Sequence, residues 1–159
     1  MVKIKKHHHQ DYPYPLFQKI TSSIELTDSF EQKNREKLFI EDICKRVEKS
    51  KSVLYVLCID DKEIGLVSLS VTAIEEFPSL QIDFLLVDKN YRGKVIKELD
   101  NVKASEYLIE LSISIAKEIQ EKVGLKYIVL LPDNDDLREI YQELNFSKLN
   151  KNGWMFISL

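Results

Sequence analysis

The stretch Asn134–Phe146, NDDLREIYQELNF, decides how the rest of the chain is interpreted. Its apolar residues Leu137, Tyr141 and Leu144 recur at intervals of four and three, which is the spacing of one face of an α-helix. Asn145 follows, and asparagine tolerates the left-handed conformation in which many helices end. The pattern therefore predicts a short amphipathic helix that stops near Asn145.

The segments on both sides of this helix are typical of strands and of a second helix. Tyr127–Leu131 is a short apolar run expected to form a buried strand, and Phe146–Leu149 with Trp154–Ile157 is expected to form a hairpin. Further upstream, Ala104–Val123 carries leucine and isoleucine at helical spacing. This region predicts a helix of about five turns.

The first half of the chain adds three more strands and a helix. Ser52–Ile59 and Glu63–Ile74 are rich in β-branched residues on either side of an Asp-Asp turn, which predicts a hairpin. Leu80–Val87 is almost continuously apolar, as expected of a central strand. A helix is predicted from the cap candidates Thr27–Ser29 to about Lys49.

The N-terminal segment predicts less regular structure. Residues 1–15 combine lysines, His7–His9 and two prolines, so we expect an irregular arm, while the even spacing in Gln18–Leu26 suggests a first strand. Adjacent histidines diverge and lack further ligands at suitable spacing, so no metal site is predicted, and the run is also compatible with a cloning remnant. The elements together predict one α/β domain over residues 16–159, a mixed sheet with helices on both faces.

Composition limits the function classes. The 159 residues hold 23 Lys and Arg against 26 Asp and Glu, a net charge of −3, so no global field favours nucleic acid or membrane. Cys44 and Cys58 lie in apolar runs without paired spacing, which favours buried thiols and a cytoplasmic protein.

The order of elements and the spacing of Asn134, Leu137, Tyr141, Leu144 and Phe146 resemble the GNAT superfamily of acetyl-CoA-dependent N-acetyltransferases, whose signature is Asn-x-x-Ala-x-x-x-Tyr-x-x-x-Gly-Phe. The resemblance implies a GNAT fold and acetyl-CoA as co-substrate. It also implies that Tyr141 is catalytic, donating a proton to the departing thiolate of CoA. Asn134 is expected to belong to the cofactor site.

Two further segments carry the resemblance. Phe84–Asp88 is similar to the family's central strand, so Leu85, Leu86 and Val87 are expected to seat pantetheine through free backbone groups. Asn90–Lys94 is similar to the start of the pyrophosphate loop, (Arg/Gln)-x-x-Gly-x-(Gly/Ala). The motif is interrupted, so Val95–Asn101 is interpreted as an insertion. The residues expected at the phosphates are Arg92, Gly93, Lys94, Lys103, Ala104 and Ser105, with Val102 in place of the first glycine.

A general base is less well marked. Some family members carry a carboxylate on the central strand; Gln81 takes that place, and Asp83 lies two residues on, on the same strand face. Asp83 is therefore a second catalytic candidate, relaying a proton through water. The alternative is a carboxylate whose hydrogen bonds only stabilise the strand.

The leading hypothesis is transfer of acetyl from acetyl-CoA to a primary amine of a small molecule or peptide, by a protein that is compatible with a homodimer. A degenerate GNAT domain that only binds a partner is the first alternative, because the loop lacks its glycines. The second is a toxin-type aminoacyl-tRNA acetyltransferase, since Val53–Ile64 and Gly65–Leu69 loosely resemble that branch. A tRNA ligand favours a basic face, which the net charge does not supply globally.

Overall fold

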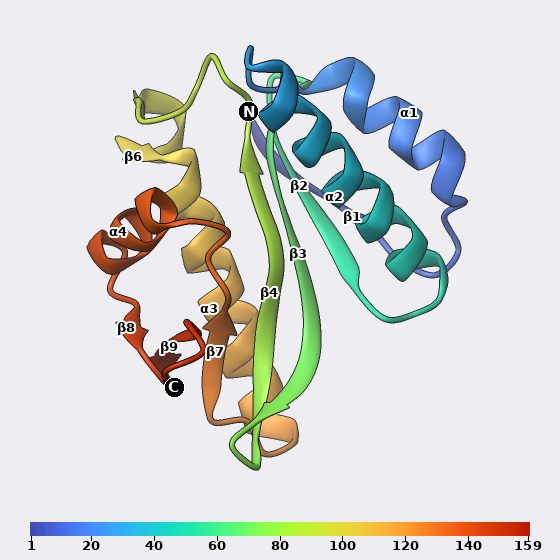
Figure 1. Cartoon of the computed structure of the whole chain (residues 1–159). Helices are drawn as coiled ribbons and strands as arrows, with labels where there is room; N and C mark the ends of the chain where they lie inside the picture. The colour runs from blue at the N-terminus through green and yellow to red at the C-terminus, as the bar shows by residue number, and fades with distance from the viewer. The chain divides into compact units, whose positions relative to one another are not determined.

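A computed structural model describes all 159 residues and has a mixed α/β fold. Seven strands form one sheet in the order β1-β2-β3-β4-β7-β9-β8, and β5 and β6 form a separate two-stranded sheet (Figure 1). Strands β4 and β7 are parallel, whereas β7 and β9 are antiparallel. No helix has the length and apolar character required to cross a bilayer.

The chain divides into two compact units. Unit 1 comprises Met1–Ser68 and Phe84–Leu108, and unit 2 comprises Leu69–Asp83 and Ile109–Leu159. Because β3 (Lys62–Ile74), β4 (Phe77–Val87) and α3 (Ala104–Lys122) contribute residues to both units, we keep a single domain over 16–159 as a proposal.

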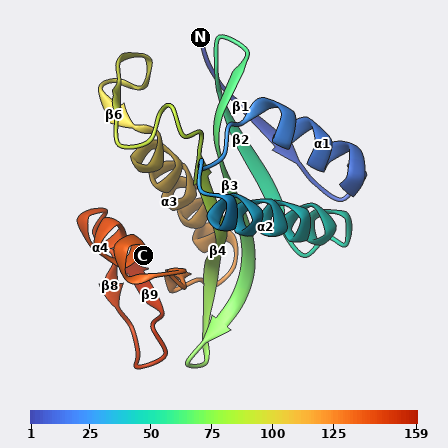
Figure 2. The same ribbon diagram turned by 45° about the horizontal axis from the view of Figure 1, so that its top comes forward.

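Unit 1 is built on the first strands and two helices. Its remaining elements are β1 (Val2–His7), α1 (Pro13–Ser23), α2 (Phe30–Glu48), β2 (Val53–Ile59), β5 (Val95–Ile96), the 3-10 turn Lys97–Leu99 and β6 (Val102–Lys103). Helices α1 and α2 lie side by side in both ribbon views (Figure 2). They enclose an apolar core that includes Ile20, Ile43, Leu54 and Leu66.

Helices cover both faces of β3 within unit 1. Leu66 faces the α1–α2 core, and Gly65, the preceding residue, must face the other way because side chains alternate along a strand. A β-carbon added at Gly65 would lie 3.1 Å from Leu108 Cδ1, in the first turns of α3. The expectation of helices on both sides of the sheet is confirmed here.

The N-terminal segment differs from the prediction. Residues 2–7 pair with β2 as an antiparallel edge strand, so the irregular arm is wrong there, and Gln18–Leu26 is not a strand because α1 occupies 13–23. The physical reason is that Pro13 and Pro15 lie in the first turn of a helix, where the missing amide costs nothing. Leu16 and Ile20 then face the core one turn apart.

Unit 2 contains the segment Asn134–Phe146. Besides its parts of β3, β4 and α3, it holds β7 (Tyr127–Leu130), α4 (Asp135–Glu143), β8 (Ser147–Lys148) and β9 (Met155–Ser158). The predicted C-terminal hairpin is confirmed, with Ser147 opposite Phe156 and Lys148 opposite Met155. Ile128, Val129 and Met155 are fully buried at its core.

Candidate functional site

Helix α4 holds Tyr141 in a fixed position. Asn134 caps the helix, since its side-chain oxygen accepts a hydrogen bond from the amide of Leu137 at 2.9 Å. One face of α4 then turns Tyr141 inward, where only 8% of it is exposed. Asn134, predicted in the cofactor site, thus acts first as a structural cap.

The end of α4 orients the ring of Tyr141. Asn145 has φ 74°, the left-handed conformation predicted for it, and the amides of Leu144 and Phe146 both donate to the carbonyl of Tyr141 at 3.0 Å. This turn brings Phe146 edge-on against Tyr141, with ring centroids 5.7 Å apart. The spacing from Asn134 to Phe146 is therefore that of a helix whose first and last turns are both fixed by hydrogen bonds.

Burial also changes the pKa of the Tyr141 phenol. Desolvation raises the pKa of its phenol to about 12, because the phenolate would be deprived of water. A phenol with its ordinary pKa of about 10 is already protonated at physiological pH, and burial extends this to still higher pH. A protonated phenol can donate a hydrogen bond, and finally the proton, to an anion formed beside it.

Asp83 is the last residue of β4 that belongs to unit 2, and its side chain accepts hydrogen bonds from two neighbours. Ser70 Oγ donates to Asp83 Oδ1 at 2.7 Å, and Gln81 Nε2 donates to the same oxygen at 3.1 Å. The second contact confirms that Gln81 and Asp83 share a strand face. These bonds fix the carboxylate, and a fixed carboxylate suits either a structural acceptor or a proton relay.

Strand β4 pairs with β7 over a short length only. The register runs from Ser79 opposite Tyr127 to Gln81 opposite Val129 and goes no further. The rest of β4, which includes Leu85, Leu86 and Val87, therefore has no partner in β7. On that side the carbonyl of Val87 already accepts from Arg92 Nε at 2.7 Å, and the seating of pantetheine on Leu85, Leu86 and Val87 stays a prediction.

A buried carboxylate that the sequence did not single out fixes the end of β4. The side chain of Asp88 is fully buried and accepts from the amides of Glu25 and Asn90 at 2.9 Å and from Lys62 Nζ at 3.2 Å. Burial alone would raise the pKa of Asp88, but these hydrogen bonds and the charge of Lys62 outweigh it and lower the pKa. Only the apolar strand before an aspartate hinted at this role.

The side chain of Arg92 makes structural hydrogen bonds within unit 1. Its Nε donates to the carbonyl of Val87 at 2.7 Å, Nη2 donates to the buried Glu36 at 3.0 Å, and Nη1 contacts Thr27 Oγ1. The guanidinium thus ties the end of β4 to α2 and to the segment before it. Arg92 was predicted at the phosphates, but its nitrogens are occupied by protein partners.

The predicted insertion is an ordered hairpin. Val95 and Ile96 pair with Lys103 and Val102, and the turn places Asp100 and Asn101 in the left-handed conformation. Val102 is in an extended strand, so this position does not need the freedom of the glycine that the motif has there. Gly93, with φ 71°, does use that freedom, and its β-position faces open space.

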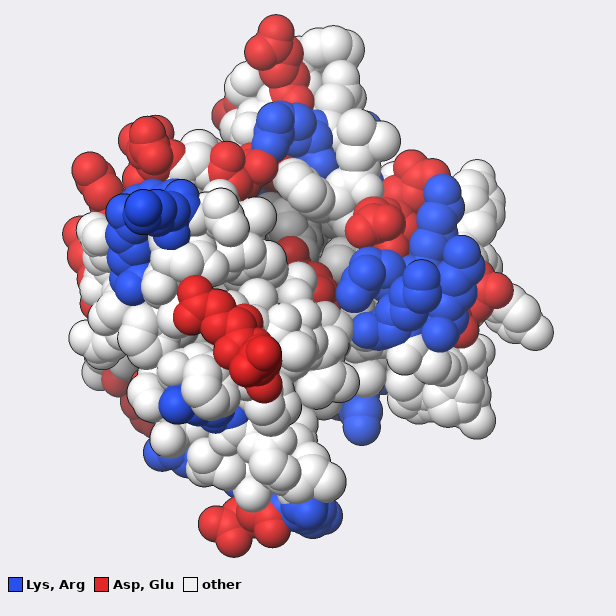
Figure 3. All heavy atoms as spheres, turned by 60° about the horizontal axis from the view of Figure 1, so that its bottom comes forward, with Lys and Arg blue, Asp and Glu red and all other residues white.

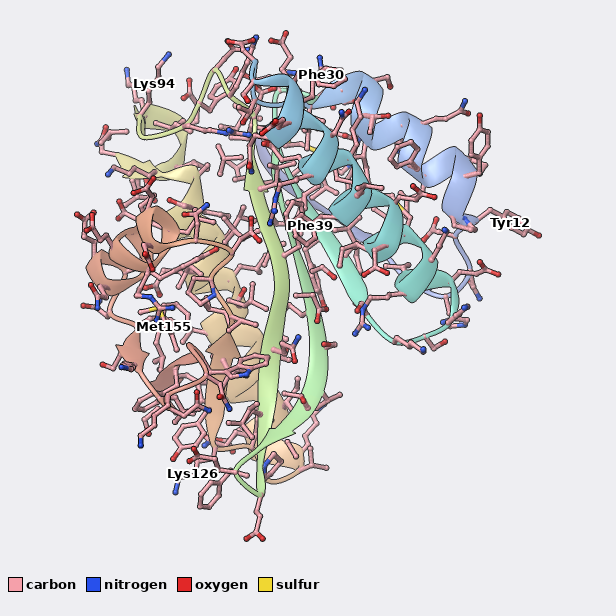
Figure 4. All side chains as sticks on the ribbon, viewed as in Figure 1. Tyr12, Phe30, Phe39, Lys94, Lys126 and Met155 are labelled. Atoms are coloured by element: carbon pink, nitrogen blue, oxygen red, sulfur yellow. The ribbon has the colours of Figure 1, made fainter.

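Three lysines mark this part of unit 1. Lys94, Lys97 and Lys103 have no carboxylate partner, and Lys94 extends outward from the loop before β5 (Figure 4). Ala104, which is buried, and Ser105 begin α3 directly after β6, so the unpaired amides of that helix follow Lys103. The arrangement offers cations and a helix N-terminus to an anion.

The predicted residues fall into the two units as follows. Leu85, Leu86, Val87, Arg92, Gly93, Lys94, Lys103, Ala104 and Ser105 belong to unit 1, and Asp83, Asn134 and Tyr141 belong to unit 2. A separate hollow of about 470 Å³ in unit 1, between α1 and the start of α2, is lined by none of them. His7 lies 3.6 Å from Asp11, and no group of three or more His, Cys, Asp or Glu side chains is arranged to hold a metal ion.

Comparison with known proteins shows the fold. No protein-family profile and no curated protein matches the chain. The crystal structure of AtaTR bound with acetyl-CoA superposes with a TM-score of 0.74 at 16% identity, covering 99% of this chain and 92% of that one. AtaT complexed with acetyl-methionyl-tRNAfMet gives 0.72 at 14% identity, covering 99% and 95%. The KacTA–DNA complex gives 0.69 at 18% identity, covering 98% and 93%. The chain thus has the GNAT fold that these toxins share.

Proposed function

We propose that this protein transfers the acetyl group of acetyl-CoA to the α-amino group of an aminoacyl-tRNA. The observation that carries the proposal is the likeness of 98–99% of the chain to AtaT and KacT structures, because AtaT is described with acetyl-CoA and with an acetylated aminoacyl-tRNA. Acetyl transfer to an amine is the coarser part of the proposal, and the tRNA-borne acceptor is the finer part. The broader hypothesis of any primary amine gives way to this more specific one.

The residues of unit 1 fit the parts of CoA. The edge of β4 that β7 leaves uncovered, at Leu85–Val87, would hydrogen-bond the amides of pantetheine as a further strand would, apart from the Val87 carbonyl that accepts from Arg92. The N-terminus of α3 and the lysines Lys94, Lys97 and Lys103 would hold the phosphates. Arg92 would contribute indirectly, by fixing the end of β4.

The transfer itself requires one bond to form and one to break. The lone pair of the acceptor nitrogen attacks the thioester carbonyl carbon, forming the C–N bond, and the C–S bond then breaks with its electron pair going to sulfur. Tyr141 supplies its phenolic proton to that sulfur, and the product is CoA with a free thiol. The nitrogen gives up one proton to a base, and the phenolate of Tyr141 regains one proton from solvent once the base has released its own, so the net reaction neither consumes nor releases a proton.

Asp83 is the proposed receiver of that proton, through a water molecule. The hydrogen bonds from Ser70 and Gln81 hold Oδ1 of this carboxylate in place, and an ionised carboxylate has lone pairs for several donors. A neutral amine is needed for attack, so this relay would matter most near neutral pH.

A non-catalytic binding module is the second candidate. It is favoured by the ordered β5–β6 hairpin, which stands where the family has a glycine loop. In that case the lysines would serve only a partner, and acetyl-CoA would neither bind nor react.

Calorimetry with acetyl-CoA and mass spectrometry of aminoacyl-tRNA test the proposal together. We expect micromolar binding of acetyl-CoA and a gain of one acetyl group on the aminoacyl moiety. Binding of acetyl-CoA with acetylation of free amines but not of aminoacyl-tRNA would remove the finer part. Absence of binding at millimolar acetyl-CoA would leave the binding module as the function.

A further inference from the structure

Cations gather at the C-terminal end of α2, although the chain as a whole is acidic. Lys45 and Arg46 lie in the last turn of the helix, Lys49 is its cap and Lys51 follows, with Glu48 as the acidic residue among them. We call Lys45, Arg46, Lys49 and Lys51 the α2 basic end. Figure 3 shows Lys and Arg side chains gathered at the right of the view, with Asp and Glu side chains beside them, on the side on which Figure 1 places α1 and α2.

Two of these four cations, Lys49 and Lys51, have no ion pair within the protein. Several other cations of unit 1 face carboxylates, as Lys62 faces Asp88 and Arg92 faces Glu36, whereas Lys94, Lys97 and Lys103 do not. Lys49 and Lys51 are exposed and have no ion pair. Lys45 reaches Glu41 at 3.1 Å across the helix surface, a solvated contact of little energetic weight.

The helix dipole accounts for part of the cluster only. Lys45 and Arg46 lie where the free carbonyls of α2 favour positive charge, and Arg46 Nε also donates to Ser52 Oγ at 3.0 Å. The backbone amide of Lys51 donates to the carbonyl of Arg46 at 2.9 Å, but its side chain is exposed and has no ion pair. Its charge therefore remains available to a ligand.

An exposed aromatic residue belongs to the same end of unit 1. Because His7 pairs with Leu54, the segment from His8 to Tyr12 starts beside the residues that follow Lys51. Tyr12 is 77% exposed, and Figure 4 shows its side chain directed away from the start of α1. A tyrosine ring in this setting can stack on an unpaired base.

Unpaired cations beside an exposed tyrosine match the chemistry of RNA, whose phosphates need positive charge and whose loop bases need a flat surface. We propose that the α2 basic end binds the phosphate backbone of RNA and that Tyr12 stacks on one of its unpaired bases. The identity of that RNA as tRNA rests on the proposed function. The surface would hold the body of the acceptor, in addition to the contacts that its aminoacyl end makes.

Fluorescence anisotropy with a labelled, deacylated tRNA transcript tests this surface without any acetyl transfer. We expect the double variant Lys49→Gln/Lys51→Gln to bind about tenfold more weakly at 50 mM salt, and the slope of log affinity against log salt to fall by about 1.4 to 1.8 for two lost phosphate contacts. The matched control Lys117→Gln/Lys122→Gln removes the same charge from exposed positions of α3 and should stay within about twofold of wild type.

Tyr12→Ala is expected to weaken tRNA binding at least about fivefold with little change in the salt slope. Phe30→Ala is its control, since Phe30 is 78% exposed at the start of α2, and it should leave the affinity unchanged. Equal losses in test and control variants, or equal binding of poly-glutamate through Lys49 and Lys51, would overturn the assignment to RNA.

The two proposals can fail separately. Specific loss of tRNA binding in a protein that does not bind acetyl-CoA would support this surface and remove the acetyltransferase. Intact acetylation of aminoacyl-tRNA by Lys49→Gln/Lys51→Gln, with unchanged tRNA affinity, would remove this surface and keep the enzyme.

Discussion

Arg92 Nη2 donates a hydrogen bond to Oε1 of Glu36 at 3.0 Å, although the two residues are 56 positions apart. Glu36 is only 3% exposed and also accepts from the amide of Thr27 at 3.1 Å. The pair fixes the segment after β4 against α2. Arg92, which the family resemblance assigns to phosphate binding, therefore has a structural role that can be measured.

Replacing Arg92 by Gln should lower the free energy of unfolding by about 2 kcal/mol, because the buried Glu36 carboxylate loses its charged partner. Urea unfolding followed by circular dichroism measures the change. Lys94→Gln is the control, as Lys94 is exposed and unpaired, and it should lower acetyl-CoA affinity while stability stays constant. A reversed pattern, with stable Arg92→Gln and unstable Lys94→Gln, would contradict this division of roles.

Asp88 should make stability depend on acidic pH. The pKa of Asp88 in the folded protein is lowered, whereas aspartate in an unfolded chain has a pKa of about 3.9. Ionised Asp88 therefore stabilises the folded state above about pH 4. That contribution disappears as the pH falls through the folded pKa. Asp88→Asn should be less stable at pH 7, by about 2 kcal/mol, and lose less stability than wild type between about pH 5 and 3.

Unfolding curves across this range measure the effect of Asp88. Asp28→Asn is the matched control, since Asp28 faces Lys89 at 2.7 Å but its side chain is 87% exposed. We expect its stability profile to follow that of wild type. Parallel profiles for Asp88→Asn and wild type would show that Asp88 is not the group responsible.

Tyr141→Phe should reduce acetyl transfer by about a hundredfold or more without unfolding the protein, because the ring keeps its contact with Phe146 while the proton donor is lost. Single-turnover acetylation with mass spectrometry measures the rate. Since the pKa of Tyr141 is about 12, the wild-type rate should show no fall from phenol ionisation up to about pH 10. Tyr127→Phe, within the aromatic group of Phe77 and Phe156, is the control and should retain full rate.

Gly65→Ala should destabilise the protein by about 1 to 3 kcal/mol, because the new methyl group would lie 3.2 Å from the carbonyl oxygen of Leu86. The carbonyl belongs to a paired strand and cannot yield easily. Thermal unfolding measures the loss, and Gly124→Ala, where the added carbon meets open space, should show no such loss. Equal melting temperatures for the two variants would mean that β4 has room to move.

Sequence periodicity was informative where an element buries one apolar face. It predicted α2, α3 and α4 and the β2–β3 hairpin closely, and Asn145 at the left-handed end of α4. It failed for β1, whose lysines and histidines hide the alternation of an edge strand. The β5–β6 hairpin was missed because two-residue strands are too short to show a period.

The candidate site was predicted unevenly for a similar reason. A motif fixes local geometry, so the left-handed end of α4 at Asn145 and the apolar helix face that carries Tyr141 followed from spacing, whereas the capping role of Asn134 was not predicted. Contacts between distant segments do not leave a periodic trace. The occupation of Arg92 by Glu36 and Val87, and the burial of Asp88, could be learned only from the folded chain.

The β5–β6 hairpin affects how binding of an anion near α3 would depend on ionic strength. Backbone amides bind an anion at contact distance, whereas Lys94, Lys97 and Lys103 would act through charge, which 0.15 M salt screens over about 8 Å. Affinity for a phosphorylated co-substrate would then vary with the ionic strength of the medium. A rise in ionic strength would therefore weaken the binding of that co-substrate, in contrast to a site built on backbone amides alone.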